Sequence, residues 1–511
     1  MKKGNLRLFS TIALSGTAVV LSYLINFFLS RYVTEIMGTE AYGFVGLAKS
    51  FVGYAQVITI VLTSFIVRYI TIKYHENDIG QANQYYSSSI AACVVLSVSL
   101  LVILIPFIIF LEKFINIPDN LIVQVKILFT LIFINFFIVT ITTPFTAFAY
   151  IKDKLNIVGV FKIISYLVDA IVMILMFTCM TPLIWYVGLG SVISSTVVFV
   201  SSIILTKKYT PELRYKKEDI SMGRIKDISS KGMWNSFNSL GNELNSGLDM
   251  LITNLLLNNV IMGQISLVKT IGSMFSILGA TVSQAFQPRL LKAYSTGDKE
   301  VFLKEISKSM RICGFFTGLA FAGFFALGET YMHLWVPSQD SQFLYAIAMF
   351  TIANYVTDGI LRPVYYINTL TLKNKLPCFV TIGGGILNVA SMFILLKFTS
   401  LGAYAVVGTT AVIMIGINLL FNPIYAAKCI NVKASFFYKI LLRYLITVAV
   451  MCLSFKGVAL LFNPNRWLVL IIAALVMVVI GLFIYFLLIN SWTENKLLFN
   501  KIKSKLLKKR A

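Results

Sequence analysis

Residues 467–490 read WLVLIIAALVMVVIGLFIYFLLIN, a stretch of 24 residues without a single charged side chain. A helix needs roughly 20 mostly apolar residues to cross the hydrocarbon core of a bilayer, so this stretch predicts a membrane-spanning helix. Thirteen further apolar runs precede it, the first at residues 8–30. The sequence therefore predicts an all-α, polytopic membrane protein with about 14 transmembrane helices.

The composition of the whole chain agrees with this fold class. Of its 511 residues, 58% are hydrophobic and 13% are charged, which is more apolar surface than a soluble core could cover. The two histidines, His75 and His333, and six cysteines without paired spacing form no pattern of metal ligands or of nucleophile and base. No Walker A sequence is present. We therefore expect no metal, no cofactor and no enzyme activity.

The basic residues indicate how the chain crosses the membrane. With loops assigned alternately to the two sides, 33 of the 44 Lys and Arg residues fall on the side of the N-terminus, and six lie within the runs. Five fall on the other side: Arg31, Lys113, Lys397, Lys456 and Arg466. The positive-inside rule then predicts that both termini are cytoplasmic. The net charge of +23 indicates topology and contact with anionic membrane lipids, not a nucleic-acid partner.

An internal repeat predicts a two-lobed architecture. A shift of 220 residues aligns, without a gap, Gly43 with Gly263, Leu47 with Leu267, Lys49 with Lys269, Tyr74 with Tyr294 and Asp78 with Asp298. Such parallel repeats are related by an axis along the membrane normal, and substrate sites lie between them. We predict an N-terminal six-helix lobe at 1–205, a basic cytoplasmic linker at 206–231 and a second, pseudo-symmetric six-helix lobe at 232–427. Two additional transmembrane helices and a basic tail follow at 428–511.

The seventh run, residues 232–257, is the most polar of the fourteen. Asn235, Asn238, Asn242, Asn245 and Asp249 recur at steps of 3, 4, 3 and 4, with Glu243 on the flank. This spacing predicts a single polar face of a helix, which we interpret as the lining of an aqueous, substrate-binding cavity. Alternatively, the polar side chains only hold neighbouring helices together, as Asn and Ser do in membranes.

Two lysines inside apolar runs are candidates for binding an anion. Lys49 and Lys269 occupy equivalent positions of the repeat, so together they could clamp one anion between the lobes. A charge at mid-bilayer costs roughly 2.5–3.5 kcal/mol, which favours a functional reason for placing it there. The alternative is that each lysine stem reaches the headgroups.

Three carboxylates within the runs are candidates for binding Na⁺ or H⁺: Asp169, Asp358 and Glu243. Asp169 lies near the middle of its run and needs a partner or a cavity. Asp358 precedes Arg362 by four residues, so the two form either a structural pair or, through Arg362, a substrate contact.

Residues 31–70 carry a family resemblance. They read RYVTEIMGTEAYGFVGLAKSFVGYAQVITIVLTSFIVRYI, and Gly38, Glu40, Tyr42 and Gly43 in this stretch resemble the signature of polysaccharide flippases of the Wzx type. Residues 248–271, LDMLITNLLLNNVIMGQISLVKTI, resemble the counterpart in the second half through Asp249 and Gly263. These flippases belong to the multidrug/oligosaccharidyl-lipid/polysaccharide exporter superfamily, whose MATE-like members have two six-helix lobes and often two C-terminal helices.

The resemblance implies a flippase for polysaccharide biosynthesis. Its substrate would be a polyprenyl-pyrophosphate-linked oligosaccharide, a repeat unit of O-antigen (lipopolysaccharide) or capsule, moved by alternating access to the outer leaflet of a bacterial cytoplasmic membrane. A polysaccharide polymerase and chain-length machinery would be partners. The lipid II flippases of this superfamily carry pyrophosphate-binding arginines in their first helix. The run at 8–30 has no charged residue, so the resemblance disfavours lipid II as substrate. A drug/cation antiporter using Asp169, and a membrane-embedded polysaccharide polymerase, are the alternatives.

Overall fold

The computed structural model describes the backbone of residues 2–488 and the side chains of residue 17 and residues 20–488. Every regular element in this range is a helix, and 12 of the helices are long and apolar enough to cross a membrane. The other two expected crossings are α1 (Lys2–Met37) and an interrupted helix made of α8 (Met222–Asn242), η5 (Glu243–Gly247) and α9 (Asp249–Leu256). The prediction of an all-α polytopic membrane fold is confirmed.

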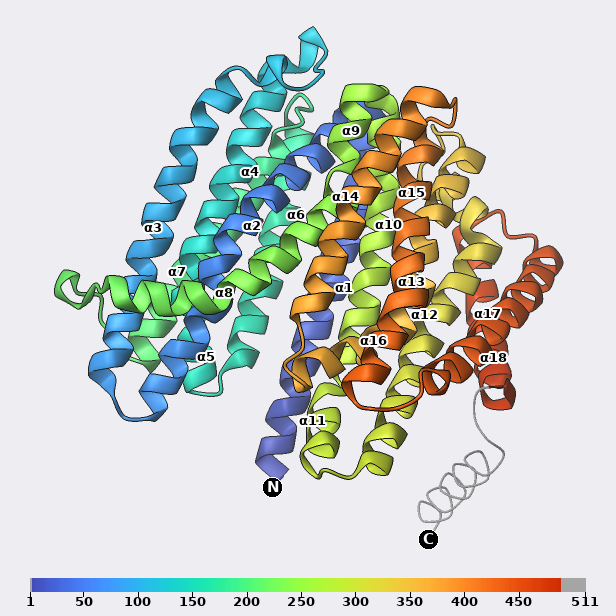
Figure 1. The fold of residues 1–511 in the computed structure, drawn as a ribbon. Helices are drawn as coiled ribbons and strands as arrows, with labels where there is room; N and C mark the ends of the chain where they lie inside the picture. The colour runs from blue at the N-terminus through green and yellow to red at the C-terminus, as the bar shows by residue number, and fades with distance from the viewer. Residues whose placement is uncertain (1, 489–511) are drawn as a thin grey trace. The chain divides into compact units, whose positions relative to one another are not determined.

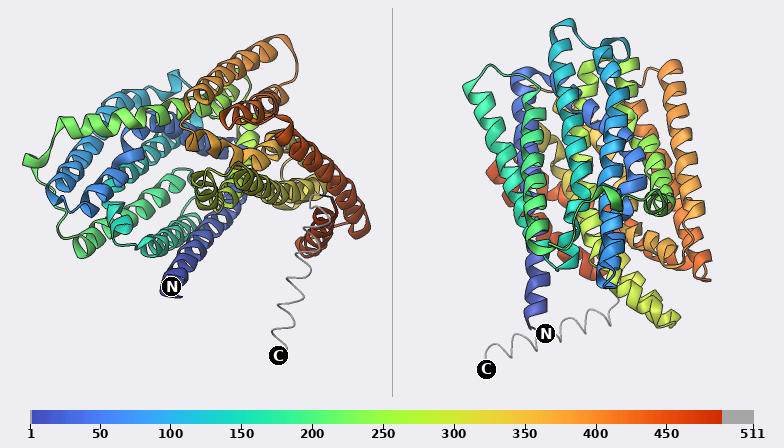
Figure 2. Two further views of the ribbon diagram at one scale, coloured as in Figure 1. Left: turned by 60° about the horizontal axis from the view of Figure 1, so that its bottom comes forward. Right: turned by 90° about the vertical axis from the view of Figure 1, so that its left-hand side faces the viewer.

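The described chain folds as two compact units. Unit 1 comprises the residues up to Leu267 together with Thr381–Val406, and unit 2 comprises Val268–Val380 and the described residues from Val407 onward. Besides α1, α8, η5 and α9, unit 1 holds α2 (Thr39–His75), α3 (Ile79–Ile109), η1 (Leu111–Lys113), η2 (Asp119–Leu121), α4 (Ile122–Thr142), η3 (Thr143–Thr146), α5 (Ala147–Ile151), α6 (Leu155–Cys179), α7 (Tyr186–Tyr209) and η4 (Lys217–Asp219). Within unit 1, helices α2 to α7 run side by side (Figures 1 and 2).

Unit 2 is built around α12 and α13. It holds α11 (Gln287–Ser295), α12 (Lys299–Trp335), α13 (Ser341–Leu370), η6 (Ile417–Phe421), α16 (Asn422–Cys429), α17 (Ser435–Phe462) and α18 (Trp467–Leu488). Helices α10 (Asn259–Gln284), α14 (Lys375–Phe398) and α15 (Ala403–Gly416) contribute residues to both units. The boundaries of the two units therefore differ from those of the predicted lobes, because α8, α9 and most of α14 pack in unit 1. The division into lobes at 1–205 and 232–427 stays a prediction drawn from the repeat.

Two turns related by the 220-residue shift have the same local geometry. Asp78 precedes α3 and Asp298 precedes α12, and each side chain accepts a hydrogen bond from a backbone N–H of the first helical turn at 2.9 Å. Such N-caps satisfy donors that the helix itself cannot pair. The residues just before them, Asn77 and Gly297, both have a left-handed backbone, with φ of 60° and 71°. Residues that the 220-residue shift aligns therefore begin helices that the same shift aligns.

Glycines that the repeat aligns pack against each other within unit 1. A Cβ on Gly43 of α2 would lie 2.8 Å from the backbone nitrogen of Gly263 on α10, and a Cβ on Gly263 would overlap the carbonyl oxygen of Thr39. Gly46 meets Ser266 just as closely one turn further on. Small residues allow two membrane helices to approach this near. A contact between equivalent residues is what a pseudo-twofold axis passing between them produces, so the packing agrees with the repeat.

The basic linker is folded against α3. Three side chains of α3 accept hydrogen bonds from linker backbone N–H groups: Asn83 from Arg214 at 2.9 Å, Ser87 from Lys216 at 3.1 Å and Ser88 from Ser221 at 2.9 Å. Ser87 and Ser88 are fully buried. The predicted linker, 206–231, therefore includes the end of α7, a short pinned segment and the start of α8, rather than a loose tether.

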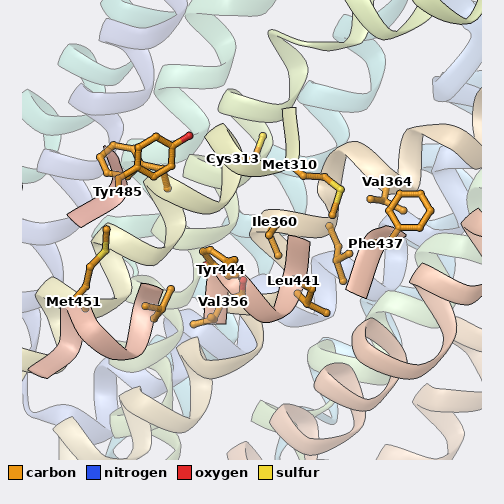
Figure 3. Packing of buried hydrophobic residues seen from close by; sticks show 14 of the residues in the cluster. Met310, Cys313, Val356, Ile360, Val364, Phe437, Leu441, Tyr444, Met451 and Tyr485 are labelled. Carbon is orange, nitrogen blue, oxygen red and sulfur yellow. The ribbon is translucent and has the colours of Figure 1, made fainter. Parts of the chain in front are cut away.

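The core of unit 2 lies where α12, α13, α17 and α18 meet (Figure 3). Its centre is formed by Met310 and Cys313 of α12, Ile360 of α13 and Phe437 of α17, all fully buried. Lipid tails are as apolar as these side chains, so close packing rather than exclusion of water holds such helices together. The basic residues at 299–311 form the first part of the continuous α12.

Candidate functional site

Helix α8 runs along α2 and is fixed to it at three levels (Figure 1). Gly232 brings the two backbones so close that a Cβ would overlap a carbonyl of α2. One turn on, the Ser236 hydroxyl donates to the carbonyl oxygen of Val57 at 2.5 Å. Both carboxylate oxygens of Glu243 lie 2.9 Å from where a Cβ of Gly53 would be. The polar seventh segment is therefore anchored on one side to α2, and Gly53 makes room for its carboxylate.

At Glu243 the seventh segment changes from an α-helix to a π-helix, which extends over Glu243–Gly247. Single π-turns are rare and occur frequently at functional sites. The Tyr54 hydroxyl of α2 donates to the carbonyl oxygen of Gly247 at 2.8 Å. Tyr54 also interacts electrostatically with Glu243 and Asp249. Two carboxyl groups and one phenol thus meet where the helix is interrupted.

The π-turn divides the predicted polar face. Asn235, Asn238 and Asn242 are exposed, whereas Asn245 and Asp249 are 0% and 4% exposed. A π-turn needs more residues per turn than an α-helix, so side chains beyond it rotate away from the face that the 3.6-residue period predicts. The expectation of one continuous stripe was wrong in this respect: the three asparagines of α8 share one environment, and the last two residues lie in another.

Asn245 holds helices together. Its side-chain NH₂ donates to the carbonyl oxygens of Gly241 at 2.7 Å and of Thr381 at 2.8 Å, the latter on α14. In return, the side chain of Asn388 on α14 donates to the backbone oxygen of Asn245 at 2.7 Å. For Asn245 the structure thus agrees with the alternative of interhelical packing. The substrate-binding role of the other residues in the segment stays a prediction.

Lys49 and Asp169 are opposite charges within unit 1. Lys49 is exposed although its neighbours Leu47 and Ala48 on α2 are fully buried. Among the described residues it forms no direct ion pair with Asp169 of α6, but the two charges interact at longer range. Asp169 Oδ1 is buried and accepts no hydrogen bond from a described residue. It lies 2.5 Å from where a Cβ of Gly190 on α7 would be, so this glycine leaves the space that the carboxylate fills.

The second lysine of the predicted pair lies in unit 2. Lys269 is partly buried on α10, two residues beyond the boundary of unit 1. Lys49 and Lys269 therefore belong to different units, and their joint action on one anion stays a prediction.

Arg362 and Asp358 form a pair within α13. The Arg362 Nε atom donates to Asp358 Oδ2 at 2.7 Å, and Nη2 donates to the Ser276 hydroxyl of α10 at 3.1 Å. Both charged side chains are about four-fifths buried, with 20% and 22% exposed. Gly279 of α10 leaves room for the guanidinium, which lies 2.9 Å from its Cβ position. Of the two interpretations offered by the sequence, the structural pair is formed, and substrate contact by Arg362 stays a prediction.

A second π-turn extends this polar network. Helix α15 ends in η6, which holds Asn418. The Tyr365 hydroxyl lies 2.8 Å from Asn418 Oδ1 and 3.2 Å from Asp358 Oδ1, and the Asn418 side chain donates to the Thr357 hydroxyl at 3.1 Å. Asp358 is therefore occupied by a guanidinium and a phenol, which makes it a weaker candidate for ion coupling than Asp169.

Several residues at these sites could not be found by sequence reasoning. Gly53 and Gly190 matter because carboxylates fill the space beside them, and Tyr54 and Asn388 matter through single hydrogen bonds to the backbone of the seventh segment. Each acts across helices distant in sequence. The only signal was their small or polar character in an apolar run, which many other positions share.

Comparison with known proteins places the chain in a family. Residues 9–293, more than half of the chain, match the family described as "Polysaccharide biosynthesis protein". The chain belongs to this family. It is also similar to the uncharacterized membrane protein EpsK of Bacillus subtilis (strain 168), with 27% identity over 424 residues that cover 83% of this chain and 84% of EpsK.

Solved structures share the fold. The lipid II flippase MurJ in an inward closed conformation superposes with a TM-score of 0.68 at 15% identity, covering 93% of this chain and 98% of that chain. An inward-facing multidrug resistance MATE family transporter of the MOP superfamily gives a TM-score of 0.66 at 13% identity, covering 80% and 94%. The resemblance to superfamily flippases drawn from residues 31–70 is thereby confirmed. This multi-pass membrane protein therefore has the fold of these two transport proteins.

Proposed function

We propose that this protein flips a polyprenyl-pyrophosphate-linked oligosaccharide from the cytoplasmic to the outer leaflet of a bacterial cytoplasmic membrane, with both termini in the cytoplasm. Its substrate is the repeat unit of an O-antigen or a capsule, and transport proceeds by alternating access. The observation that carries the proposal is the Lys49 side chain of α2, which is exposed directly after two fully buried residues and whose charge interacts at a distance with that of Asp169.

The balance between Lys49 and Asp169 suits the transport of an anion. With the carboxylate ionised, the Lys49–Asp169 pair has no net charge, so in the empty protein this pair does no work against the membrane potential. The loaded site carries the charge of the pyrophosphate. An inside-negative potential favours outward movement of an anion by roughly 2.3 kcal/mol per charge per 100 mV, so the potential alone can drive export.

The exposed asparagines of α8 supply contacts for sugars. Asn235, Asn238 and Asn242 each offer both hydrogen-bond donors and acceptors, and sugar hydroxyls need both. These asparagines lie on α8, and the Ser236 hydrogen bond anchors α8 to α2, the helix that carries Lys49. We assign pyrophosphate binding to Lys49 and sugar binding to the asparagines.

The test is complementation of a strain that lacks the native gene. Lys49→Gln should lower surface polysaccharide at least tenfold at equal protein level, since one lost charge-assisted hydrogen bond contributes about 1.5–3 kcal/mol. The undecaprenyl-linked repeat unit should accumulate inside the cell. The matched control is Lys162→Gln, which removes another exposed lysine, on α6, and should export normally.

Three results would contradict the proposal. Normal export by Lys49→Gln would remove this residue from the mechanism. Unchanged surface display of single repeat units in the deletion strain, with only polymer lost, would indicate a polymerase, and a changed efflux of cationic dyes with normal polysaccharide would indicate a drug antiporter.

A further inference from the structure

A cationic pocket lies between α12 and α17 in unit 2, apart from the polar network of Arg362. Its polar wall is formed by Ser307 and Arg311 of α12 and by Ser435, Lys439 and Arg443 of α17. Its volume is about 330 Å³. One water molecule occupies roughly 30 Å³ in the liquid, so the pocket has room for a group of several polar atoms.

The polar wall of the pocket follows one stripe of α17. Ser435, Lys439 and Arg443 are spaced four residues apart and therefore lie on one face of the helix. Ser307 and Arg311 have the same spacing on α12. The pocket thus presents three cations and two serine hydroxyls, and no acidic side chain is among its described lining residues.

The cations of α17 are available for a ligand. Lys439 and Arg443 are exposed, and neither charged group forms an ion pair or a hydrogen bond with another described residue. These two like charges, one helical turn apart, repel each other, and an anion between them relieves this repulsion. Phosphate is the anion whose oxygens match both a guanidinium fork and hydroxyl donors.

The apolar side of the pocket indicates that the phosphate belongs to a lipid. Phe436, Ile440 and Tyr444 flank the polar stripe, and Tyr444 and Ile360 belong to the packed core beneath it (Figure 3). Beyond Arg443, the same face of α17 continues with Ile446 and Leu453, which are 54% and 75% exposed. Exposed aliphatic side chains in a membrane-spanning helix contact acyl chains. A headgroup in the pocket would therefore have its own tails along α17.

We propose that this pocket binds the headgroup of an anionic phospholipid, which holds α17 against α12. Arg311, Lys439 and Arg443 contact the phosphate, Ser307 and Ser435 donate hydrogen bonds to it, and the acyl chains lie on Ile446 and Leu453. Basic pockets between membrane helices bind anionic headgroups by this chemistry. The site is independent of the transported substrate.

The test uses the purified full-length protein in a neutral detergent, titrated with phosphatidylglycerol or with phosphatidylcholine as the zwitterionic control. Phosphatidylglycerol should raise the temperature of thermal unfolding, and phosphatidylcholine should not. In the double variant Lys439→Gln/Arg443→Gln, the half-saturating lipid concentration should rise about 25-fold, because each cation near a headgroup contributes about fivefold, or about 1 kcal/mol. Lys456→Gln, which removes an exposed lysine elsewhere on α17, should titrate as the unmodified protein does.

Charge-conserving variants separate binding from folding. Lys439→Arg/Arg443→Lys should restore the lipid response, so a loss in the glutamine variant cannot be ascribed to misfolding. An equal response of the glutamine variant and the unmodified protein would overturn the proposal. A full response to inorganic phosphate at the same concentration would overturn the assignment to a lipid, because the pocket would then bind the anion without tails.

Discussion

Replacement of Gly263 by alanine tests the close packing of α2 against α10. The new Cβ would overlap the Thr39 carbonyl oxygen, and because the obstructing atom belongs to backbone, no side-chain rotation can relieve the overlap. Overpacking costs about 1–3 kcal/mol, and alanine gains about 0.8–1.0 kcal/mol over glycine in a helix, so a net loss near 2 kcal/mol is expected for this severe case. Gly43→Ala should behave in the same way, since its Cβ would lie 2.8 Å from the nitrogen of Gly263.

The control for this prediction is Gly383→Ala. Gly383 lies inside α14 in the same unit, and apart from the neighbouring backbone of its own helix no atom lies within 4 Å of its Cβ position. This variant should gain up to about 1 kcal/mol from helix propensity. The measurement is the temperature at which half of the purified protein loses its native tryptophan fluorescence in detergent, at one fixed heating rate because unfolding of such proteins is often irreversible. If Gly263→Ala proves as stable as Gly383→Ala, the close approach of the two helices is refuted.

Two further predictions concern charged groups. In unit 2, Arg362→Met should destabilise the protein more than the double variant Arg362→Met/Asp358→Asn, because the single change leaves a mostly buried carboxylate without its cation. An equal fall in the thermal unfolding temperature of the two variants would contradict this. In η1, the 2.6 Å hydrogen bond from Lys126 lowers the pKa of the Glu112 carboxyl below its ordinary value. The stability that the ionised Glu112 contributes is therefore complete above the ordinary pKa of the carboxyl and is lost as the pH falls through the lowered pKa. Glu112→Gln should remove this part of the acid sensitivity of thermal unfolding. An unchanged pH profile of the variant would show that Glu112 makes no such contribution.

The sequence predicted the elements that depend on local composition. Apolar runs of sufficient length must become helices in a bilayer, where every backbone polar group has to be paired within its own segment. The 220-residue repeat was readable for a similar reason, because Asp78 and Asp298 cap helices through bonds to residues two or three positions away. Family resemblance was carried by the short stretch around Gly38 and Gly43, which borders one turn.

The candidate site was predicted less completely, because its geometry depends on how helices meet. The asparagine spacing of the seventh segment is helical, yet a π-turn at Glu243–Gly247 sends Asn245 and Asp249 to a different environment from Asn235. A π-turn has no residue signature that distinguishes it from the surrounding helix. Here it is held by Tyr54 of α2 and Asn388 of α14, two residues whose partners no local pattern reveals.

The amino-acid sequence by itself determined that this chain is a helical membrane protein with an internal repeat, because hydrophobic length and capping are properties of neighbouring residues. Only the tertiary structure decided which polar groups are exposed and which are occupied: Asp358 is paired with Arg362, Asn245 joins two helices, and Asp169 fills the space beside Gly190 while balancing Lys49 at a distance. The physical reason is that the energy of a charge in a membrane is set by the groups that surround it, and those groups come from distant helices.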